Sequence, residues 1–242
     1  MNPNHFEAIN TTISLEKSYM MEVLSITGMI IWQVPSGEYD RRVTIFCKER
    51  GKITALAKGA RKPTGKLGAV SFPYCFGKFT LIPSRSFYII KEAVIENYFE
   101  GLHQDYEGAC YAAYFAEIAC VCAQENNDEA EFLKLLYQTL RALLAENIPN
   151  RLVRVTYELK VLFLNGEIPH TLTPQDLSFA PPNHIEPLMR AYEHIFISKV
   201  QSLYTFSLSE EVRHDLERLT LSFVQIAWNY SFKSLAILKT LG

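Results

Sequence analysis

Short hydrophobic runs alternate with turn signals in the first part of the chain. The run 52–58 places Ile53, Ala55 and Ala57 on one face, which is the two-residue period of a strand. Similar β-rich runs cover residues 23–32, 42–47, 71–82 and 87–95. A turn-rich segment, 59–69, has room for one short helix after Pro63. Five strands with a helical turn between the third and the fourth predict a small Greek-key β-barrel of the OB type.

Beyond Gly101 the hydrophobic period becomes that of helices. Residues 105–123 are rich in Ala, Tyr and Cys, a composition typical of closely packed helices. The next helix is predicted to be capped by Asn127 and broken at 147–149. Its apolar stripe consists of Phe132, Leu135, Leu136, Leu140, Leu143 and Leu144. A further helix carries Leu152, Val155, Leu159 and Leu162 and is predicted to end at Asn165-Gly166.

The last third of the chain contains the longest predicted loop and two more helices. Four prolines fall within residues 166–183 and predict that loop. Asn183 and Glu186 are suited to cap a helix through about residue 199. Ser209 is suited to begin another helix, which runs toward Gly242 with a break near Asn229. We therefore expect an α+β multidomain protein with a flexible leader (1–21), an OB-fold domain (22–100) and an α-helical bundle domain (101–242).

Targeting signals are not evident in the sequence. The start has no basic region followed by an apolar stretch, and no run of about 18 uncharged apolar residues occurs anywhere. We therefore expect a cytoplasmic protein that does not enter a membrane. The adjacent Met20 and Met21 leave open a shorter natural start.

The five cysteines are Cys47, Cys75, Cys110, Cys120 and Cys122, and they form no CxxC pair. An odd number in apolar surroundings predicts buried, reduced thiols. Zinc, with His170 or His184 completing a site, is the alternative. Cys120 and Cys122 are two apart on a predicted helix, where side chains point to different sides and cannot easily share a metal. We therefore expect neither a metal nor another cofactor.

Basic residues are concentrated in one stretch of an otherwise acidic chain. The whole chain has a formal charge of −2, but residues 41–66 hold nine of its 24 lysines and arginines against the single acid Glu49. This stretch carries +8, so the remaining residues carry −10. Such a block favours phosphate binding, and OB barrels bind single strands with a basic groove and aromatic platforms. The candidate platforms are Tyr39, Phe72, Tyr74, Phe76, Phe79, Phe87 and Tyr88, although Phe72, Tyr74 and Phe76 are more typical of a strand core.

This region also has two enzymatic interpretations. Residues 59–67 superficially resemble a P-loop, but the first glycine is one residue too early, Pro63 removes an N–H, and Leu67 replaces the required Ser or Thr. Glu38 and Asp40 are two apart and could share a metal ion, although no third ligand is apparent. A Ser-His-Asp or Cys-His set does not stand out either. We therefore expect a binding protein rather than an enzyme.

Several strings of residues resemble the RecO family of bacterial recombination mediators. In the first domain they are residues 27–31, 37–42, 49–53 and 57–63, the last reading Ala-Lys-Gly-Ala-Arg-Lys-Pro. In the helical part they are residues 111–117, 132–136, 154–160 and 232–238. The resemblance extends in order over about residues 22–242, and the segment 27–63 is its most specific part.

The resemblance implies an OB-fold joined to a helical domain that binds single- and double-stranded DNA without consuming nucleotide. It implies annealing of complementary strands and, with RecR, assistance in loading RecA onto strands covered by single-strand-binding protein. These activities imply a nucleoid-associated protein of the bacterial cytoplasm. Many family members carry a four-cysteine zinc module between helices. Residues 165–183 contain no cysteine, so this chain departs from that pattern.

We assign two sets of candidate binding residues. The first is expected to contact DNA phosphates and consists of Arg41, Arg42, Lys52, Lys58, Arg61, Lys62 and Lys66. The second is expected to hold the acidic, Phe-ended tail of single-strand-binding protein and consists of Lys134, Arg141, Arg151 and Arg154. For the second set, ordinary solvated helix charges remain an equal alternative.

The sequence leaves three other functions open. They are an OB-fold module for structured RNA, a metal-dependent nuclease that uses Glu38 and Asp40, and a protein-interaction scaffold whose basic block faces an acidic partner.

Overall fold

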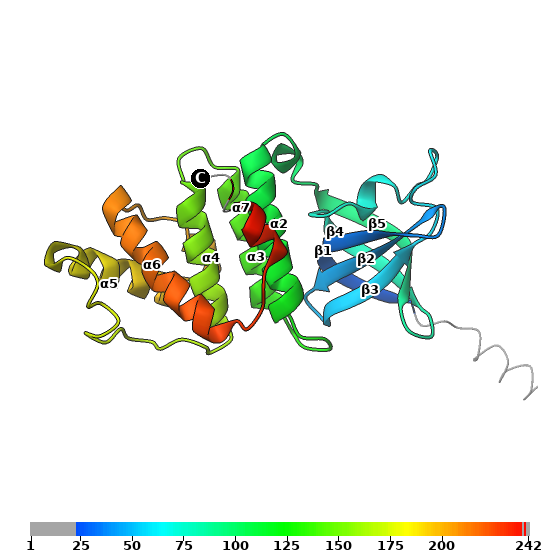
Figure 1. The fold of residues 1–242 in the computed structure, drawn as a ribbon. Helices are drawn as coiled ribbons and strands as arrows, with labels where there is room; N and C mark the ends of the chain where they lie inside the picture. The colour runs from blue at the N-terminus through cyan, green and yellow to red at the C-terminus, as the bar shows by residue number, and fades with distance from the viewer. Residues whose placement is uncertain (1–22, 239, 241–242) are drawn as a thin grey trace, which may run out of the picture. The chain divides into compact units, whose positions relative to one another are not determined.

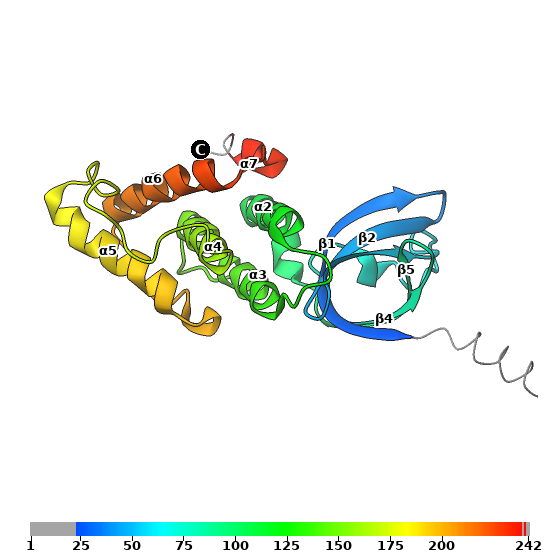
Figure 2. The same cartoon turned by 90° about the horizontal axis from the view of Figure 1, so that it is seen from below.

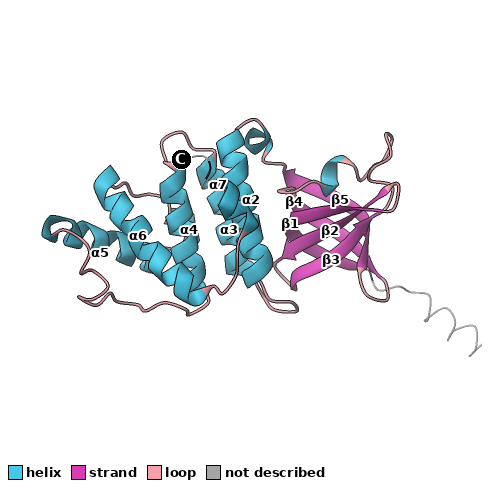
Figure 3. Cartoon of the chain, viewed as in Figure 1, coloured by secondary structure: helices cyan, strands magenta, loops and turns pink. Residues whose placement is uncertain are grey.

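The computed structural model describes residues 23–238 and 240, so the predicted leader, residues 1–21, lies outside the described part. Strands come first along the chain and helices follow (Figure 1; Figure 3). The chain divides into two compact units. Unit 1 comprises the described residues up to Ile45 together with Ile53–Asn97. Unit 2 comprises Phe46–Lys52 and the chain from Tyr98 onward.

Unit 1 contains a closed barrel with the strand order β1-β2-β3-β5-β4, which confirms the predicted OB-type fold. The strands are β1 (Leu24–Ser36), β2 (Asp40–Cys47), β3 (Gly51–Ala57), β4 (Phe76–Pro83) and β5 (Tyr88–Asn97). β1 and β4 pair antiparallel from Leu24↔Leu81 to Met29↔Phe76, and β3 and β5 pair parallel. β1 is long and curves along the barrel, so that it neighbours β4 as well as β2 (Figure 2). Met29, Ile45, Ala55, Phe79 and Leu81 fill the interior and are fully buried.

The fourth strand differs from its predicted bounds. It begins at Phe76 instead of residue 71, because the short 3-10 helix η1 (Ala69–Ser71) and a turn take up the preceding residues. Tyr74 in this turn has a φ of +71°, which does not fit a strand. The helical turn expected after Pro63 is therefore η1.

The helical elements are η2 (Glu100–His103), α2 (Tyr106–Cys122), α3 (Ala130–Leu143), α4 (Asn150–Leu164), α5 (Pro182–Ile197), η3 (Val200–Ser202), α6 (Glu210–Ala227) and α7 (Lys233–Leu238). The apolar stripes predicted for α3 and α4 are buried, with Leu144 as the exception. Asn165-Gly166 ends α4, and Gly166 has a φ of +70°. The break near Asn229 separates α6 from α7. None of the helices in the described part is long and apolar enough to span a bilayer.

One of the three predicted side-chain caps is confirmed. Ser209 precedes α6, and its hydroxyl accepts a hydrogen bond from the Val212 N–H. Asn127 is wrong as a cap, because α3 begins three residues later and the Asn127 amide donates to the Glu129 carboxylate at 3.3 Å. Asn183 is also wrong, because α5 begins at Pro182 with Pro181 as its cap residue. Proline fits the first turn of a helix, where its missing N–H costs no bond.

Within unit 2, the turn 46–52 is held against the helical segments. Its backbone bonds run from Lys52 N to the Gln124 carbonyl (3.2 Å) and from Asn126 N to the Arg50 carbonyl (3.0 Å). The Phe46 ring meets the Phe132 ring edge-on at 5.1 Å. Backbone pairing and aromatic contact together anchor this turn.

A buried lysine completes the end of α5. Lys160 on α4 donates from Nζ to the carbonyls of Ile195 (2.9 Å), Phe196 (2.8 Å) and Ser198 (2.9 Å). Burial lowers the pKa of this ammonium group. The last carbonyls of a helix lack partners within it, so Lys160 supplies the donors that α5 requires.

Candidate nucleic-acid interface

The turn between β1 and β2 and the loop that follows β3 lie side by side in unit 1. The Asp40 carboxylate accepts from the Gly59 N–H at 2.7 Å, and the Tyr39 carbonyl accepts from the Arg61 N–H at 2.9 Å. The Arg61 guanidinium also donates to the Gly37 carbonyl at 3.1 Å. These three bonds hold the two segments together, and the basic residues of both segments are thereby brought near one another.

The loop after β3 is folded compactly upon itself. Successive backbone bonds link Lys62 N to the Gly59 carbonyl (3.1 Å) and Gly65 N to the Lys62 carbonyl (2.9 Å). A Cβ at Gly65 would lie 2.1 Å from the Gly59 carbonyl oxygen, so only glycine fits there. The loop therefore presents its exposed cations from a fixed backbone, and these are Lys58, Arg61, Lys62 and Lys66.

Arg41 is the anchored member of this group. Its Nη1 donates to the Ser71 hydroxyl at 2.7 Å and to the Gly68 carbonyl at 3.1 Å. Its Cζ lies 4.1 Å from the centre of the Phe72 ring. Burial first, and then the charge of Arg61, lowers the pKa of Arg41. Because Arg41 and Arg61 are near enough for their charges to interact, an anion that binds beside both is favoured.

Two of the predicted aromatic platforms lie beside cations of this surface. Tyr39 is 45% exposed and Phe72 is 43% exposed, and the Lys62 Nζ lies 5.1 Å from the centre of the Tyr39 ring. Tyr74 and Phe79, in contrast, are buried. Phe76 and Tyr88 are half-buried, and Phe87 is exposed. The aromatic positions near the basic turn are thus Tyr39 and Phe72.

The seven predicted phosphate contacts are not all brought together. Arg42 is exposed on β2, next to Arg41. Lys52 belongs to unit 2, where its Nζ donates to the Cys120 carbonyl at 2.6 Å. The name basic loop surface is used below for Arg41, Arg42, Lys58, Arg61, Lys62 and Lys66.

The four cations predicted to bind a protein tail fall into two groups. Lys134 pairs with Glu131, and Arg141 donates to Gln138, both on the exposed face of α3. Arg151 and Arg154 on α4 instead share Glu217 of α6, at 3.9 Å and 3.8 Å. Pairs of this kind are weak where solvent reaches them.

Arg154 lines a mainly apolar cavity of about 340 Å³. Burial raises the pKa of Glu158, which also lines the cavity, although Arg154 and the Tyr114 hydroxyl act in the opposite direction. The other lining residues are Tyr114, His214, Glu217, Arg218, Leu221, Val224, Gln225 and Leu235. The sequence did not indicate Arg218, because nothing in α6 alone shows that this residue lines a cavity together with Arg154 of α4.

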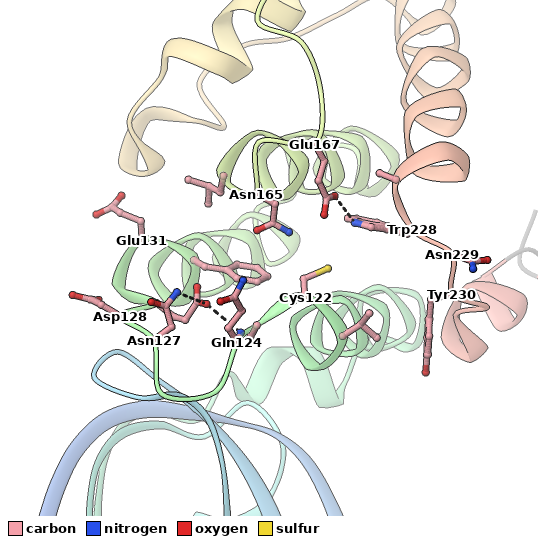
Figure 4. A pocket seen from close by; sticks show the side chains of 16 residues that line it. Cys122, Gln124, Asn127, Asp128, Glu131, Asn165, Glu167, Trp228, Asn229 and Tyr230 are labelled. Carbon is pink, nitrogen blue, oxygen red and sulfur yellow. Dashed lines mark hydrogen bonds between the residues drawn. The ribbon is translucent and has the colours of Figure 1, made fainter.

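A larger cavity in unit 2, of about 810 Å³, is lined by acidic side chains (Figure 4). Asp128, Glu129, Glu131 and Glu167 line it, and none of the lysines or arginines that the structure describes does. The Glu167 carboxylate accepts from the Trp228 indole N–H at 3.1 Å. Four carboxylates repel phosphate, so this cavity is unsuited to a nucleic-acid backbone.

The metal and nuclease alternatives gain no support from the geometry. The Asp40 carboxylate is engaged by the Gly59 N–H. His184 Nδ1 lies 2.7 Å from the Asp215 carboxylate, and the His170 ring packs on Phe196. Cys47 and Cys75 are buried as predicted, whereas Cys110, Cys120 and Cys122 are partly exposed. Burial raises the pKa of Cys120 to about 11 and that of Cys122 to about 12, which disfavours the thiolates that zinc requires.

Two sequence models match most of the chain. The model described as "Recombination protein O N terminal" matches residues 21–99, which include the barrel and the basic loop surface. The model described as "Recombination protein O C terminal" matches residues 103–171. The chain belongs to the RecO family of DNA repair proteins. The N-terminal match covers every member of the basic loop surface, and the C-terminal match covers the whole predicted tail-binding set.

Curated relatives match this RecO-family chain over most of its length, and two of them over nearly all of it. The DNA repair protein RecO of Acetivibrio thermocellus is 28% identical over 91% of this chain and 98% of its own length. The protein of the same name from Clostridium perfringens strain 13 is 27% identical over 90% of this chain and 98% of its own length. The one from Caldicellulosiruptor saccharolyticus is 31% identical over 62% of this chain and 61% of its own length.

Proposed function

We propose that this chain is a recombination mediator that binds DNA phosphates through the basic loop surface. It anneals complementary strands and, with RecR, assists RecA in loading onto single strands covered by single-strand-binding protein. It does so at the bacterial nucleoid without catalytic turnover. The observation that carries the proposal is the rigid juxtaposition of the β1–β2 turn with the loop after β3. This juxtaposition concentrates positive charge on the barrel of a RecO-family protein.

The contact with DNA is proposed to be mainly electrostatic. Lysine and arginine contacts to phosphates position a protein on DNA without reading the sequence. The loop cations are exposed on a backbone fixed by its own hydrogen bonds. Little backbone entropy of this loop is therefore lost when a strand binds. Lys52 remains in the proposed set, although its Nζ already donates to the Cys120 carbonyl.

The decisive experiment is annealing of complementary oligonucleotides coated with single-strand-binding protein. The test variant carries Lys58→Glu, Arg61→Glu and Lys62→Glu. We expect it to lose both DNA binding and annealing, because three contacts become repulsions. A charge-matched control carries Lys78→Glu, Arg85→Glu and Lys91→Glu, which are exposed elsewhere on the barrel and outside the basic loop surface. Unaltered annealing by a folded test variant would reject the proposed site.

Competition between DNA and RNA of equal length separates this proposal from an RNA-binding module. Recognition of the 2′-hydroxyl would favour RNA, whereas backbone phosphate contacts favour neither strongly. Incubation of DNA with magnesium or manganese tests the nuclease alternative, since cleavage would contradict a role without turnover.

We further propose that the tail of single-strand-binding protein docks on unit 2. The cavity beside Arg154 offers apolar walls together with Arg218 and His214, a combination that suits a carboxylate-ended aromatic peptide. Titration with such a peptide should show weaker binding for Arg154→Ala, and also for Arg141→Ala if the α3 cations take part. Arg190→Ala, an exposed arginine on α5, is the control. Unchanged affinity in both variants would remove these residues from the site.

A further inference from the structure

Trp32 on β1 is a large apolar side chain that is left mostly exposed to solvent. Its side chain is 57% exposed, whereas the three preceding residues, Met29, Ile30 and Ile31, are at most 2% exposed. Single exposed apolar side chains are common on protein surfaces, so exposure alone assigns no role. The charges on the strands around Trp32 indicate a role for this exposed side chain.

Three neighbouring strands present an outer face that is almost free of negative charge. β1, β2 and β3 are adjacent in the barrel, and Asp40 is the single carboxylate in these strands. That carboxylate already accepts the Gly59 N–H. β5, in contrast, exposes Glu92 and Glu96. A polyanion would therefore prefer the outer face of the first three strands.

Trp32 lies on β1, the strand next to β2, which carries Arg42 of the basic loop surface. Val43 and Ile45 of β2 are buried, which leaves Arg42 pointing outward on the strand beside β1. Trp32 is four residues before Ser36, the end of β1, or about 13 Å along the strand. The β1–β2 turn that follows carries Tyr39, and its carbonyl holds the loop through Arg61.

We propose that Trp32 is a stacking platform for an unpaired base of a single DNA strand whose phosphates lie on the basic loop surface. This inference rests on the proposed function and extends it to a preference for unpaired strands. Indole has a large π-face, and stacking on it tolerates any base, as annealing of arbitrary sequences requires. Bases inside a duplex are already stacked on their neighbours and offer no free face.

Replacing the indole tests this role on the intact chain. Trp32→Ala should weaken binding of oligothymidine by about 5- to 150-fold, the range expected from removing one stacked base. Binding to duplex DNA should change less than about 2-fold, and the salt dependence should stay as in the wild type, because stacking releases no counterions. Trp32→Phe, which keeps an aromatic ring, should restore much of the affinity. Val94→Ala, at a site 60% exposed on β5, is the matched control and should bind as the wild type does.

Fluorescence gives a second, independent readout. The chain has two tryptophans, and Trp228 is only 8% exposed and hydrogen-bonded to Glu167. Oligothymidine should quench the emission of the wild type and leave that of Trp32→Phe unchanged. A Trp32→Ala protein with wild-type affinity for oligothymidine, or one weakened equally on duplex DNA, would overturn the stacking role. If only the stacking role fails, the triple reversal at Lys58, Arg61 and Lys62 should still abolish DNA binding. If the proposed function itself fails, the triple reversal should leave DNA binding unchanged.

Discussion

At the scale of single residues, Gly51 and Gly37 share a left-handed backbone but differ in what a side chain would meet. Their φ angles are +59° and +61°. A Cβ on Gly51 would lie 1.8 Å from the Gln124 carbonyl oxygen, whereas a Cβ on Gly37 would meet nothing within 4 Å. The turn signal in the sequence is similar at both positions, and only the packing distinguishes them.

We therefore expect Gly51→Ala to destabilise the protein more than Gly37→Ala. Gly37→Ala should cost about 1 kcal/mol, the usual strain of a left-handed alanine. Gly51→Ala should cost at least about 2 kcal/mol, since backbone must also move away from the new methyl group. Urea unfolding of the two variants measures the difference in free energy, and equal losses would contradict the contact at Gln124.

At the scale of elements, the short helix α7 is held to α2 by one carboxylate. Glu117 accepts from the N–H groups of Lys233 (3.0 Å) and Ser234 (2.9 Å), from the Ser234 hydroxyl and from the Tyr230 hydroxyl. Phe232 adds an edge-on contact with Tyr114 at 5.5 Å. Burial alone would raise the pKa of Glu117, but these hydrogen bonds outweigh it and lower the pKa below its ordinary value of 4.5.

This lowered pKa gives the attachment of α7 a defined pH dependence. A carboxyl group with a lower pKa in the folded chain stabilises fully above its unfolded value, near 4.5, and loses that contribution as the pH falls through the folded value. Glu117→Gln should therefore lower stability by about 1 kcal/mol at neutral pH, a modest figure because the carboxylate is partly exposed. The difference from wild type should shrink in acid. Urea unfolding at neutral pH and at a pH below 4.5 measures this difference in stability, and Glu146→Gln, a change at an exposed carboxylate, is the control. A difference that does not depend on pH would contradict the role of the charge.

At the scale of the whole molecule, an acidic chain concentrates positive charge on one part of its barrel. If four or five cations contact phosphates, log K for DNA should fall with log salt at a slope of about −3 to −4.5. The Lys58, Arg61 and Lys62 reversal should flatten this slope, and the charge-matched reversal at Lys78, Arg85 and Lys91 should not. Binding titrations over a range of salt concentrations give the slopes. A slope near zero for the wild type would contradict a phosphate interface.

Local signals in the sequence predicted most elements of the fold. The alternation in 52–58 and the apolar stripes of α3 and α4 depend on burial of one face, which leaves a periodic pattern in any single chain. Element ends were less predictable. Asn127 and Asn183 looked like caps, but the chain begins both helices elsewhere, because competing turns and prolines set those boundaries.

The sequence by itself determined the barrel, the helical region and the basic stretch, since hydrophobic period and charge are properties of neighbouring residues. The tertiary structure decided which cations of that stretch act together. It joined Asp40 to Gly59 and Tyr39 to Arg61 across about twenty residues, and it separated Lys52 into the other unit. It also left Trp32 exposed while burying Tyr74 and Phe79. These outcomes depend on contacts between distant segments, and such contacts leave no periodic trace in the sequence.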